Sequence, residues 1–419
     1  MMKADIQLQW KTSRSVLPAS GEQQLVYILL QATPQGVVHT DSKLPLNLCL
    51  VLDRSSSMRG ERLAQVKEAT HRIIDHMSNG DYFSLITFND RAEVVIPAQR
   101  VLDKNDLKLR VSAIEAAGGT EMATGLAMAV QEIRRVAIVR GISRVMLLTD
   151  GRTYGDEGRC VQIARLAQER RIGVTVLGIG TEWNEDLLET MAAHENSRAH
   201  YITSPREVTQ VFAEELQRMY ATFAQGVKVY VKVRSEGVLR SLDRVQPFIA
   251  PVGIGEEQPQ TWIGNLGDWT SGDVHSFLLE VMVPPLPEGE QSILQLAIRY
   301  TVPDNNAQQQ VAATTVQIPV VSPEQAEKNT SVDSNVKRWL EKVVAYRLQA
   351  RAWQAVADGN IEEATTKLRM AGTRLFESGE TELARTIEQE ATKLLQSGTT
   401  SAEGRKRIKY GTRGLMGAK

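Results

Sequence analysis

The sequence predicts a doubly wound, Rossmann-like α/β domain that is inserted into an antiparallel β-sandwich and followed by a C-terminal helical bundle. Three observations support this fold class. Apolar runs and amphipathic stretches alternate through residues 44–221, as in parallel sheets covered by helices. Segments with period-two alternation lie on both sides of this region. Helical spacing with glycine breaks follows from residue 322.

The central segment begins with a continuous apolar run at 46–52, which is typical of a strand buried on both faces. An amphipathic stretch from Leu63 to Met77 follows it. The remaining strands are predicted at 82–88, 93–96, 144–149, 172–179 and 200–203, and the helices after Asp103, after Thr120 and near 159–171, 184–193 and 205–220. This alternation predicts a parallel sheet, in which ligands bind at the carboxyl ends of the strands.

Five side chains with oxygen donors fall at predicted strand ends or helix starts: Asp53, Ser55, Ser57, Thr120 and Asp150. The first three alternate, so in an extended or turning segment they point the same way. Carboxylate and hydroxyl oxygens suit Mg²⁺, Mn²⁺ or Ca²⁺ better than zinc. A small octahedral ion needs about six ligands, so water or an outside group must supply the rest. Each fragment alone is also common in turns and helix caps.

With these five positions in place, residues 44–220 resemble a von Willebrand factor type A (vWA) domain. The positions match that family's metal-ion-dependent adhesion site (MIDAS) one by one. The resemblance covers a little under half of the chain. It implies a Mg²⁺, Mn²⁺ or Ca²⁺ ion and a protein ligand whose acidic side chain completes the metal coordination. It also implies binding rather than catalysis.

The segments on either side of the vWA segment, 44–221, have a β pattern. Alternation at 6–10 and 25–31 predicts two half-buried strands. Later strands are predicted at 227–233, 260–264, 275–283, 292–301 and 310–320. Because two strands cannot bury a core alone, we expect residues 1–43 and 222–321 to form one sandwich that carries the vWA segment as an insertion. An N-terminal hairpin lying on the sheet edge is the alternative.

Residues 322–398 are predicted to form a helical domain. Three apolar stripes with helical spacing are separated at Gly359, Gly379 and Gly398. This pattern favours a small bundle or a stack of helical hairpins. The repeat is roughly 20 residues long, which is too short for a tetratricopeptide array.

Residues 399–419 are predicted to form a flexible basic tail, because their hydrophobic content is low. The segment contains one acidic residue, Glu403, and six basic residues: Arg405, Lys406, Arg407, Lys409, Arg413 and Lys419. Thr412, expected to be exposed, is a candidate phosphosite. Leu415 at the third position after it resembles the residue that forkhead-associated domains favour. A phosphate at Thr412 would suit an arginine-lined pocket.

Composition narrows the classes of function. The formal net charge of −1 gives no strong nucleic-acid signal. No apolar stretch reaches the roughly 20 residues that span a bilayer. The first residues lack a signal-peptide core, and the two cysteines are expected to be reduced thiols. These features favour a cytoplasmic protein without a membrane span.

The sequence therefore predicts a non-enzymatic, bacterial and cytoplasmic adaptor or scaffold that binds an acidic side chain of a partner protein through a metal. A Ser/Thr kinase, a phosphatase or a forkhead-associated protein is expected as a further partner. One alternative is an accessory factor of a MoxR-type AAA+ ATPase, since type A domains often serve such machines. Another is a metal-dependent phosphoester hydrolase, for which Glu121 and Arg152 are the candidate base or nucleophile.

Overall fold

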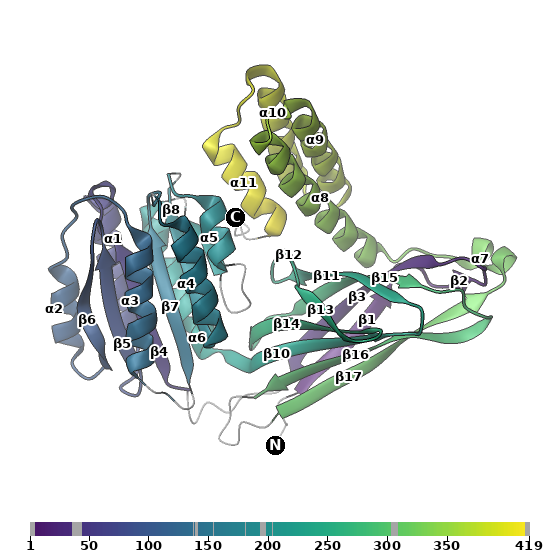
Figure 1. Ribbon diagram of the computed structural model, residues 1–419, viewed down its shortest axis with the longest axis horizontal. Coiled ribbons are helices and arrows are strands. Elements are labelled where there is room, and N and C mark those ends of the chain that lie inside the picture. Colours follow the sequence, from purple (N-terminus) through teal and green to yellow (C-terminus); the bar gives the residue numbers. More distant parts are fainter. Residues whose placement is uncertain are drawn as a thin grey trace. The chain divides into compact units, whose positions relative to one another are not determined.

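The computed structural model describes residues 5–35, 44–136, 138, 141–153, 155–180, 182–192, 198–202, 204–302 and 309–414. The described residues fall into two compact units. One unit contains those of Met1–Val38, Ala224–Val302 and Ala307–Lys419, and the other contains those of His39–Phe223. Figure 1 shows the strands and helices of each unit.

An α/β sheet forms the centre of the His39–Phe223 unit (Figure 1). Within the described residues its order is β6-β5-β4-β7-β8-β9. The strands are β4 (Leu46–Asp53), β5 (Tyr82–Phe88), β6 (Ala92–Arg100), β7 (Ile142–Thr149), β8 (Ile172–Ile179) and β9 (Arg198–Ile202). Every residue of β4 is buried, as its continuous apolar run predicts. Residue 203, the last of the strand predicted at 200–203, lies outside the described residues.

One strand of this sheet corrects the prediction of a parallel sheet. β4, β5, β7, β8 and β9 pair in parallel, but β6 pairs antiparallel with β5. No helix intervenes between β5 and β6, and a short turn joins only antiparallel neighbours. β6 is thus an antiparallel edge strand on an otherwise parallel sheet.

Helices cover both faces of the sheet (Figure 1). They are α1 (Glu61–His76), α2 (Lys104–Ser112), α3 (Met122–Arg135), α4 (Glu157–Glu169), α5 (Glu185–Ala192) and α6 (Val208–Tyr220), with the short 3-10 helices η2 (Ser56–Met58) and η3 (Pro205–Glu207). Apolar residues of α1, α2 and α6 form one core cluster with Leu48, Leu50 and Leu52 of β4. Asp103 caps α2, as predicted, by accepting hydrogen bonds from two backbone amides.

The strand order sets the place where a ligand can bind. The chain passes from β4 to β5 on one side, and β7 then pairs with β4 on the other side. The carboxyl ends of β4 and β7 are therefore neighbours where the winding reverses. In open α/β sheets, ligands bind in the crevice at such a reversal.

Two further sheets belong to the other unit. The described strands of the first follow the order β1-β3-β15-β11-β12, and those of the second the order β13-β14-β10-β16-β17-β2. The first consists of β1 (Asp5–Thr12), β3 (Gln24–Gln35), β15 (His275–Val283), β11 (Val238–Gln246) and β12 (Ala250–Pro251). The second consists of β13 (Ile254–Gln258), β14 (Thr261–Thr270), β10 (Thr222–Val233), β16 (Gly289–Thr301), β17 (Gln309–Val321) and β2 (Leu17–Pro18).

The N-terminal strands pair with strands that follow the α/β segment in the sequence. β3 pairs antiparallel with β15, and β2 pairs in parallel with β17. Burial alternates along β10, so that one face of the strand is apolar. The N-terminal segment thus shares sheets with residues 222–321.

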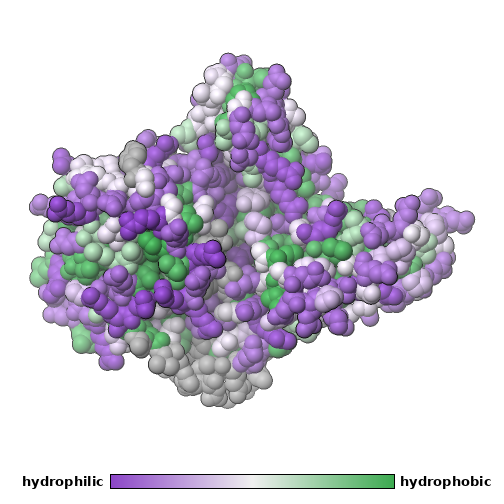
Figure 2. Space-filling view, viewed as in Figure 1, coloured by the Kyte–Doolittle hydropathy of each residue, from purple (hydrophilic) through white to green (hydrophobic). Residues whose placement is uncertain are grey.

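The C-terminal helical domain begins after β17 and is present as predicted. Its first helices are α7 (Pro323–Asn329), α8 (Ser334–Ala357), α9 (Ile361–Glu377) and α10 (Thr381–Ser397). The second half of α8 packs with α9 and α10 around Trp353, Leu368 and Ile387, whereas its first half packs on the sheet through Val336 and Val343. Hydrophilic side chains cover much of the outer face of this domain (Figure 2). Within the described residues, no helix combines the length and apolar character needed to cross a membrane.

The prediction of a flexible tail at 399–419 is wrong for the residues that the structure describes. Residues Ala402–Arg413 form helix α11, and Ser401 caps it by accepting a hydrogen bond from the Gly404 amide at 2.9 Å. Ile408 and Tyr410 are buried. The average hydrophobicity of this segment did not indicate a helix, because it contains two large apolar side chains among many charged ones.

Thr412 is also misplaced by the sequence prediction, which expects it to be exposed. It is buried in α11, and its hydroxyl donates to the Lys409 carbonyl at 3.1 Å. The end of the helix is attached to the β11–β12 turn, because the Ile249 amide donates to the Arg413 carbonyl at 2.9 Å. Leu415 and the rest of 415–419 lie outside the described residues, as does 36–43 at the first predicted domain boundary.

Candidate metal site

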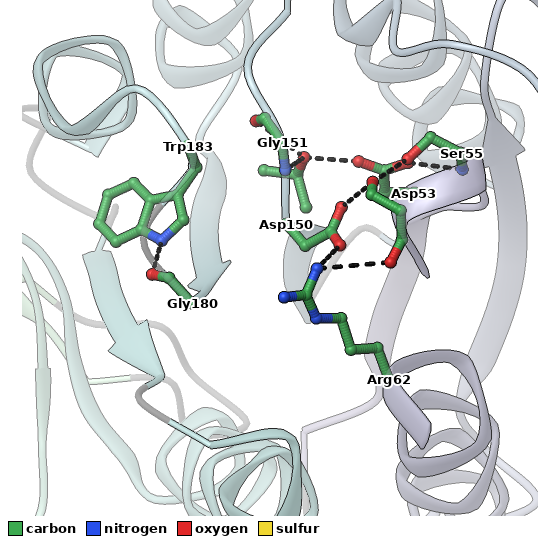
Figure 3. Close-up of polar contacts among 9 residues, drawn as sticks. Asp53, Ser55, Arg62, Asp150, Gly151, Gly180 and Trp183 are labelled. Carbon is green, nitrogen blue, oxygen red and sulfur yellow. Dashed lines mark hydrogen bonds and ion pairs between the residues drawn. The ribbon is translucent and has the colours of Figure 1, made fainter. Parts of the chain in front are cut away.

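Asp53 lies at the carboxyl end of β4, where the chain leaves the buried centre of the sheet. Its Oδ1 accepts a hydrogen bond from the Ser55 amide at 2.8 Å as the chain turns into η2. The hydroxyl oxygens of Ser55 and Ser57 lie 2.9 Å apart and share a hydrogen bond. Three of the predicted ligands therefore gather in one short loop, of which Figure 3 labels Asp53 and Ser55.

Asp150 follows β7 and joins this group from the neighbouring strand. The Ser57 hydroxyl donates to Asp150 Oδ1 at 2.7 Å. Asp53 and Asp150 are buried, whereas Ser57 is exposed. The buried Asp150 carboxylate thus accepts a hydrogen bond from an exposed residue, Ser57.

Thr120 comes from the loop before α3 and is half-buried. Its Oγ1 lies 3.5 Å from where a Cβ on Gly151 would be, so it is beside the residue that follows Asp150. Gly118 allows this approach: its φ is +82°, and a Cβ there would lie 2.4 Å from Asp90 Oδ2. The Ser56 amide and hydroxyl both donate to the Gly118 carbonyl at 3.0 Å. The structure therefore brings all five predicted residues to one edge of the sheet.

Backbone hydrogen bonds join the loops that carry these residues. The Ala117 amide donates to the Arg54 carbonyl at 2.8 Å, and the Arg54 amide donates to the Phe88 carbonyl at 2.8 Å. The Glu121 amide donates to the Asn89 carbonyl at 2.7 Å. The Thr120 loop is thereby attached to the ends of both β4 and β5.

The loop after β7 holds the start of α3. Asp156 accepts hydrogen bonds from the Ala123 amide at 2.7 Å and from the Thr153 hydroxyl. The Thr153 hydroxyl also lies 3.2 Å from the Met122 amide and 3.3 Å from the Thr120 carbonyl. The segment after Asp150 thus caps the helix that follows Thr120.

The charge on Asp53 is in an unfavourable environment. Burial raises the pKa of Asp53, hydrogen bonds from Thr149 and Ser55 lower it, and the negative charge of Asp150 raises it further, with a net increase over the ordinary value. The Thr149 hydroxyl donates to Asp53 Oδ2 at 2.6 Å. A divalent cation beside the two carboxylates would favour their ionised forms.

Arg62 is a member of this group that the sequence did not reveal. It lies in the first turn of α1, and its guanidinium pairs with Asp150 Oδ2 (Figure 3). The same Nη1 lies 3.3 Å from the Ser57 carbonyl. Because Arg62 and Asp150 are 88 residues apart, no local spacing indicates the contact. Thr149, which also contacts Asp53, directly precedes Asp150 in the Thr-Asp-Gly run, so its place beside the site can be expected from the local sequence.

The donor set fits a hard divalent cation. It consists of two buried carboxylates and three hydroxyls, all oxygen ligands: Asp53, Asp150, Ser55, Ser57 and Thr120. Across the described part of the chain, no cluster of three or more His, Cys, Asp or Glu side chains is arranged to hold a metal. A metal at this site would therefore depend on the hydroxyls as well as the carboxylates.

The two residues proposed for hydrolysis have other contacts. Glu121 accepts a hydrogen bond from the Thr124 hydroxyl at 3.3 Å, within the first turn of α3. Arg152 Nε donates to the Glu182 carbonyl at 3.2 Å. Both side chains therefore have structural partners in the loops around the site.

Comparison with known proteins agrees with this architecture. The von Willebrand factor type A domain model matches residues 47–214, and the model of the Sll0103-like C-terminal alpha-helical domain matches residues 334–418. The uncharacterized protein sll0103 of Synechocystis sp. is 30% identical over 368 residues, which cover 87% of this chain and 86% of that protein. The chain belongs to the Sll0103-like family of von Willebrand factor type A domain proteins. The predicted vWA domain and C-terminal helical domain are thereby confirmed.

Other relatives match about two fifths of this Sll0103-like chain. YfbK of Escherichia coli is 26% identical over 192 residues, which are 44% of this chain and 33% of YfbK. Inter-alpha-trypsin inhibitor heavy chain H4 of Bos taurus is 31% identical over 173 residues, which are 38% of this chain and 19% of that protein. The chain spans a third or less of either relative.

Two solved structures share the fold of the Sll0103-like chain over nearly its whole length. The von Willebrand factor type A protein from Catenulispora acidiphila superposes with a TM-score of 0.78 at 17% identity, covering 98% of this chain and 97% of that one. The ArnB paralog VWA2 from Sulfolobus acidocaldarius has a TM-score of 0.58 at 14% identity, covering 99% and 100%. At these identities the likeness shows the fold alone.

Proposed function

We propose that this chain is a divalent-metal-dependent protein-binding adaptor or scaffold. The observation that supports it best is the hydrogen-bonded series from Asp53 through Ser55 and Ser57 to Asp150, with Thr120 beside Gly151. These oxygens come from three loops at the reversal of the sheet, where ligands bind in this class of fold. Asp53, Ser55, Ser57, Thr120 and Asp150 would hold the ion, with Mg²⁺ as the first choice and Mn²⁺ or Ca²⁺ as alternatives.

The partner would offer an acidic side chain. Two carboxylates formally balance a dication, and the hydroxyls of Ser55, Ser57 and Thr120 contribute no charge. The metal would therefore act as a Lewis acid that attracts one more carboxylate. Ser57 is exposed and Thr120 half-buried, so the hydroxyl side is the side on which a partner can approach.

Metal binding is tested first on the purified protein. Mg²⁺ should raise the melting temperature of the wild type, because an ion that binds only the folded state stabilises it by mass action. Asp53→Asn should abolish that rise. Asp106→Asn removes the same charge from an exposed pair with Arg110 on α2 and is the matched control. An equal rise in all three proteins would contradict the site.

Partner binding is tested by capture from a cell extract with and without a chelator. Proteins retained by the wild type in Mg²⁺, but lost with chelator and with Thr120→Val, support metal-bridged binding. If chelator and variant leave the captured set unchanged, the adaptor function fails. Capture of a ring-shaped ATPase would instead favour the alternative of a MoxR-type AAA+ accessory factor.

A phosphoester hydrolase remains the enzymatic alternative. Its candidate residues contact Thr124 and the Glu182 carbonyl, which favours structural roles for Glu121 and Arg152. Assay of phosphomonoesters with Mg²⁺ and Mn²⁺ tests it directly. Activity that is lost in Asp53→Asn but kept in Asp106→Asn would overturn the non-enzymatic proposal.

We further propose that residues 1–43 and 222–321 form one β-sandwich into which the vWA domain of 44–221 is inserted. The β3–β15 and β2–β17 pairings support it, because they join strands from both sides of that domain. A fragment of 44–221 should then unfold cooperatively on its own.

We also propose that the protein is cytoplasmic. This setting suits Cys49 and Cys160, which are both free and buried. Cell fractionation tests this localisation.

Phosphorylation of Thr412, with a forkhead-associated reader, would require α11 to open first. The hydroxyl is buried and bonded to the Lys409 carbonyl, so a kinase could not reach it in the folded helix. Mass spectrometry after co-expression with Ser/Thr kinases tests the modification. Absence of phosphate on Thr412 would remove this part of the proposal.

A further inference from the structure

The candidate metal site already contains a cation of the protein. Arg62 Nη1 pairs with Asp150 Oδ2 and approaches the Ser57 carbonyl at 3.3 Å. The Asp150 side chain is fully buried, and the Arg62 side chain is 37% exposed, so the guanidinium approaches the carboxylate from the solvent side. Arg62 Nη2 lies 3.7 Å from where a Cβ on Gly180, after β8, would be. The guanidinium therefore lies among the loops after β4, β7 and β8 (Figure 3).

The two carboxylates of the site have different partners. Asp53 accepts hydrogen bonds from neutral groups, the Ser55 amide and the Thr149 hydroxyl. Asp150 accepts one from the Ser57 hydroxyl on Oδ1 and one from the Arg62 cation on Oδ2. Among the described residues of the site, Asp150 therefore has its charge balanced by an ion pair, and Asp53 does not.

A dication and the Arg62 guanidinium would both be attracted to the Asp150 carboxylate and would repel each other at close range. Because the two cations repel each other, a metal that binds Asp150 Oδ2 would displace the Arg62 guanidinium from that oxygen. We propose that Arg62 is an internal competitor for Asp150 that weakens metal binding and must leave this carboxylate before the metal can use it. The inference rests on the proposed metal-binding function.

The opposite role is structurally reasonable and predicts the opposite sign. An arginine that only held Asp150 in position would strengthen metal binding, so its removal would weaken the affinity. Competition predicts tighter binding after removal. Direct measurement of metal affinity therefore separates the two roles.

The experiment is a Mg²⁺ and Mn²⁺ titration of the full chain by calorimetry, with thermal unfolding in parallel. Arg62→Gln should bind Mg²⁺ about tenfold more tightly than the wild type. Arg62→Lys keeps the charge and should remain close to the wild type. Arg72→Gln removes the same charge further along α1, where it pairs with exposed Glu68, and should not change the affinity.

Thermal unfolding provides a second test of the competition between Arg62 and the metal. Without metal, Arg62→Gln should melt below the wild type, because buried Asp150 has lost its ion pair, yet it should gain more from Mg²⁺. Equal or weaker Mg²⁺ affinity in Arg62→Gln, with metal binding intact in the wild type, overturns competition alone. If the wild type and Arg62→Gln are both folded and neither binds Mg²⁺ or Mn²⁺, the proposed metal function fails with it.

Discussion

The guanidinium of Arg347 on α8 donates to the carboxylate of Asp243 on β11, with 2.5 Å between Nη2 and Oδ2. Arg347 also lies 2.9 Å from the Ser241 hydroxyl and 3.5 Å from Glu280 Oε2. Burial raises the pKa of Asp243, and Arg347 counteracts part of that increase. This pair attaches the helical domain to the sheet beside an apolar contact between α8 and β11.

Arg347→Ala should destabilise the unit that contains both elements. The substitution leaves the buried Asp243 carboxylate without its cation, and breaking such a pair costs about 2–3 kcal/mol when one partner is a third exposed. Urea unfolding at neutral pH measures the loss. Because the pKa of Asp243 would rise further, the deficit should shrink at low pH, where the carboxyl is neutral. A pH-independent deficit would contradict this account.

Thr149→Val should destabilise the vWA domain and weaken metal binding. It removes the donor to Asp53 Oδ2, a buried carboxylate, at a cost of about 1–3 kcal/mol. Thr149→Ser keeps the hydroxyl and is the matched control. Thermal unfolding without metal compares the two variants. Equal melting temperatures would show that this hydrogen bond does not stabilise the domain.

Gly178→Ala should be strongly unfavourable for packing. A Cβ at Gly178 would lie 2.3–2.8 Å from three ring atoms of Trp183, which is fully buried. Overpacking of this kind costs about 1–3 kcal/mol. Gly158→Ala, in the first turn of α4, meets no atom within 4 Å and should be neutral or slightly stabilising. Denaturant unfolding of both variants tests the contrast, and similar stabilities would refute it.

Asp333→Asn should change how stability depends on pH. Burial raises the pKa of Asp333, but hydrogen bonds from the Val336 amide, Lys11 and the Asn335 amide lower it more, so the folded value lies below the ordinary one. The charge therefore stabilises the fold above the unfolded pKa of about 3.9 and loses this effect as pH falls. At neutral pH the variant should lose about 0.3–1 kcal/mol, because asparagine still caps α8 but carries no charge.

Unfolding free energies of the wild type and Asp333→Asn, measured from neutral pH down to the acid range, test this prediction. The difference should vanish at low pH. A constant difference at every pH would show that the charge of Asp333 is not responsible.

The sequence predicted the parts of this protein that depend on local patterns. The run before Asp53 and the alternation of strands and helices indicated the sheet, and sheet topology then brought Asp150 beside Ser57. Features set by distant contacts were not predicted. The pairing of Arg62 with Asp150 joins residues with no local relation.

Helix α11 escaped prediction for a different reason. Its buried apolar side chains include Ile408 and Tyr410. Its basic residues make contacts elsewhere in the same unit: Arg405 Cζ, for example, lies 5.5 Å from the centroid of the Trp353 ring. Amino-acid composition counts the charged residues of this segment but does not show which groups they contact in the folded protein. The direction of β6 was missed because the alternation of elements was extended across a short turn that contains no helix.

The loops around the candidate site are joined largely through main-chain groups, including the amides of Ser56, Ala117 and Glu121. Main-chain donors remain whatever side chain a residue carries. The shape of this edge can therefore persist while individual ligands are exchanged. A member of the family could lose the ion, or bind a different ion, and still keep the same loop structure. Within the family, the metal-binding side chains can therefore change while the backbone of these loops stays the same.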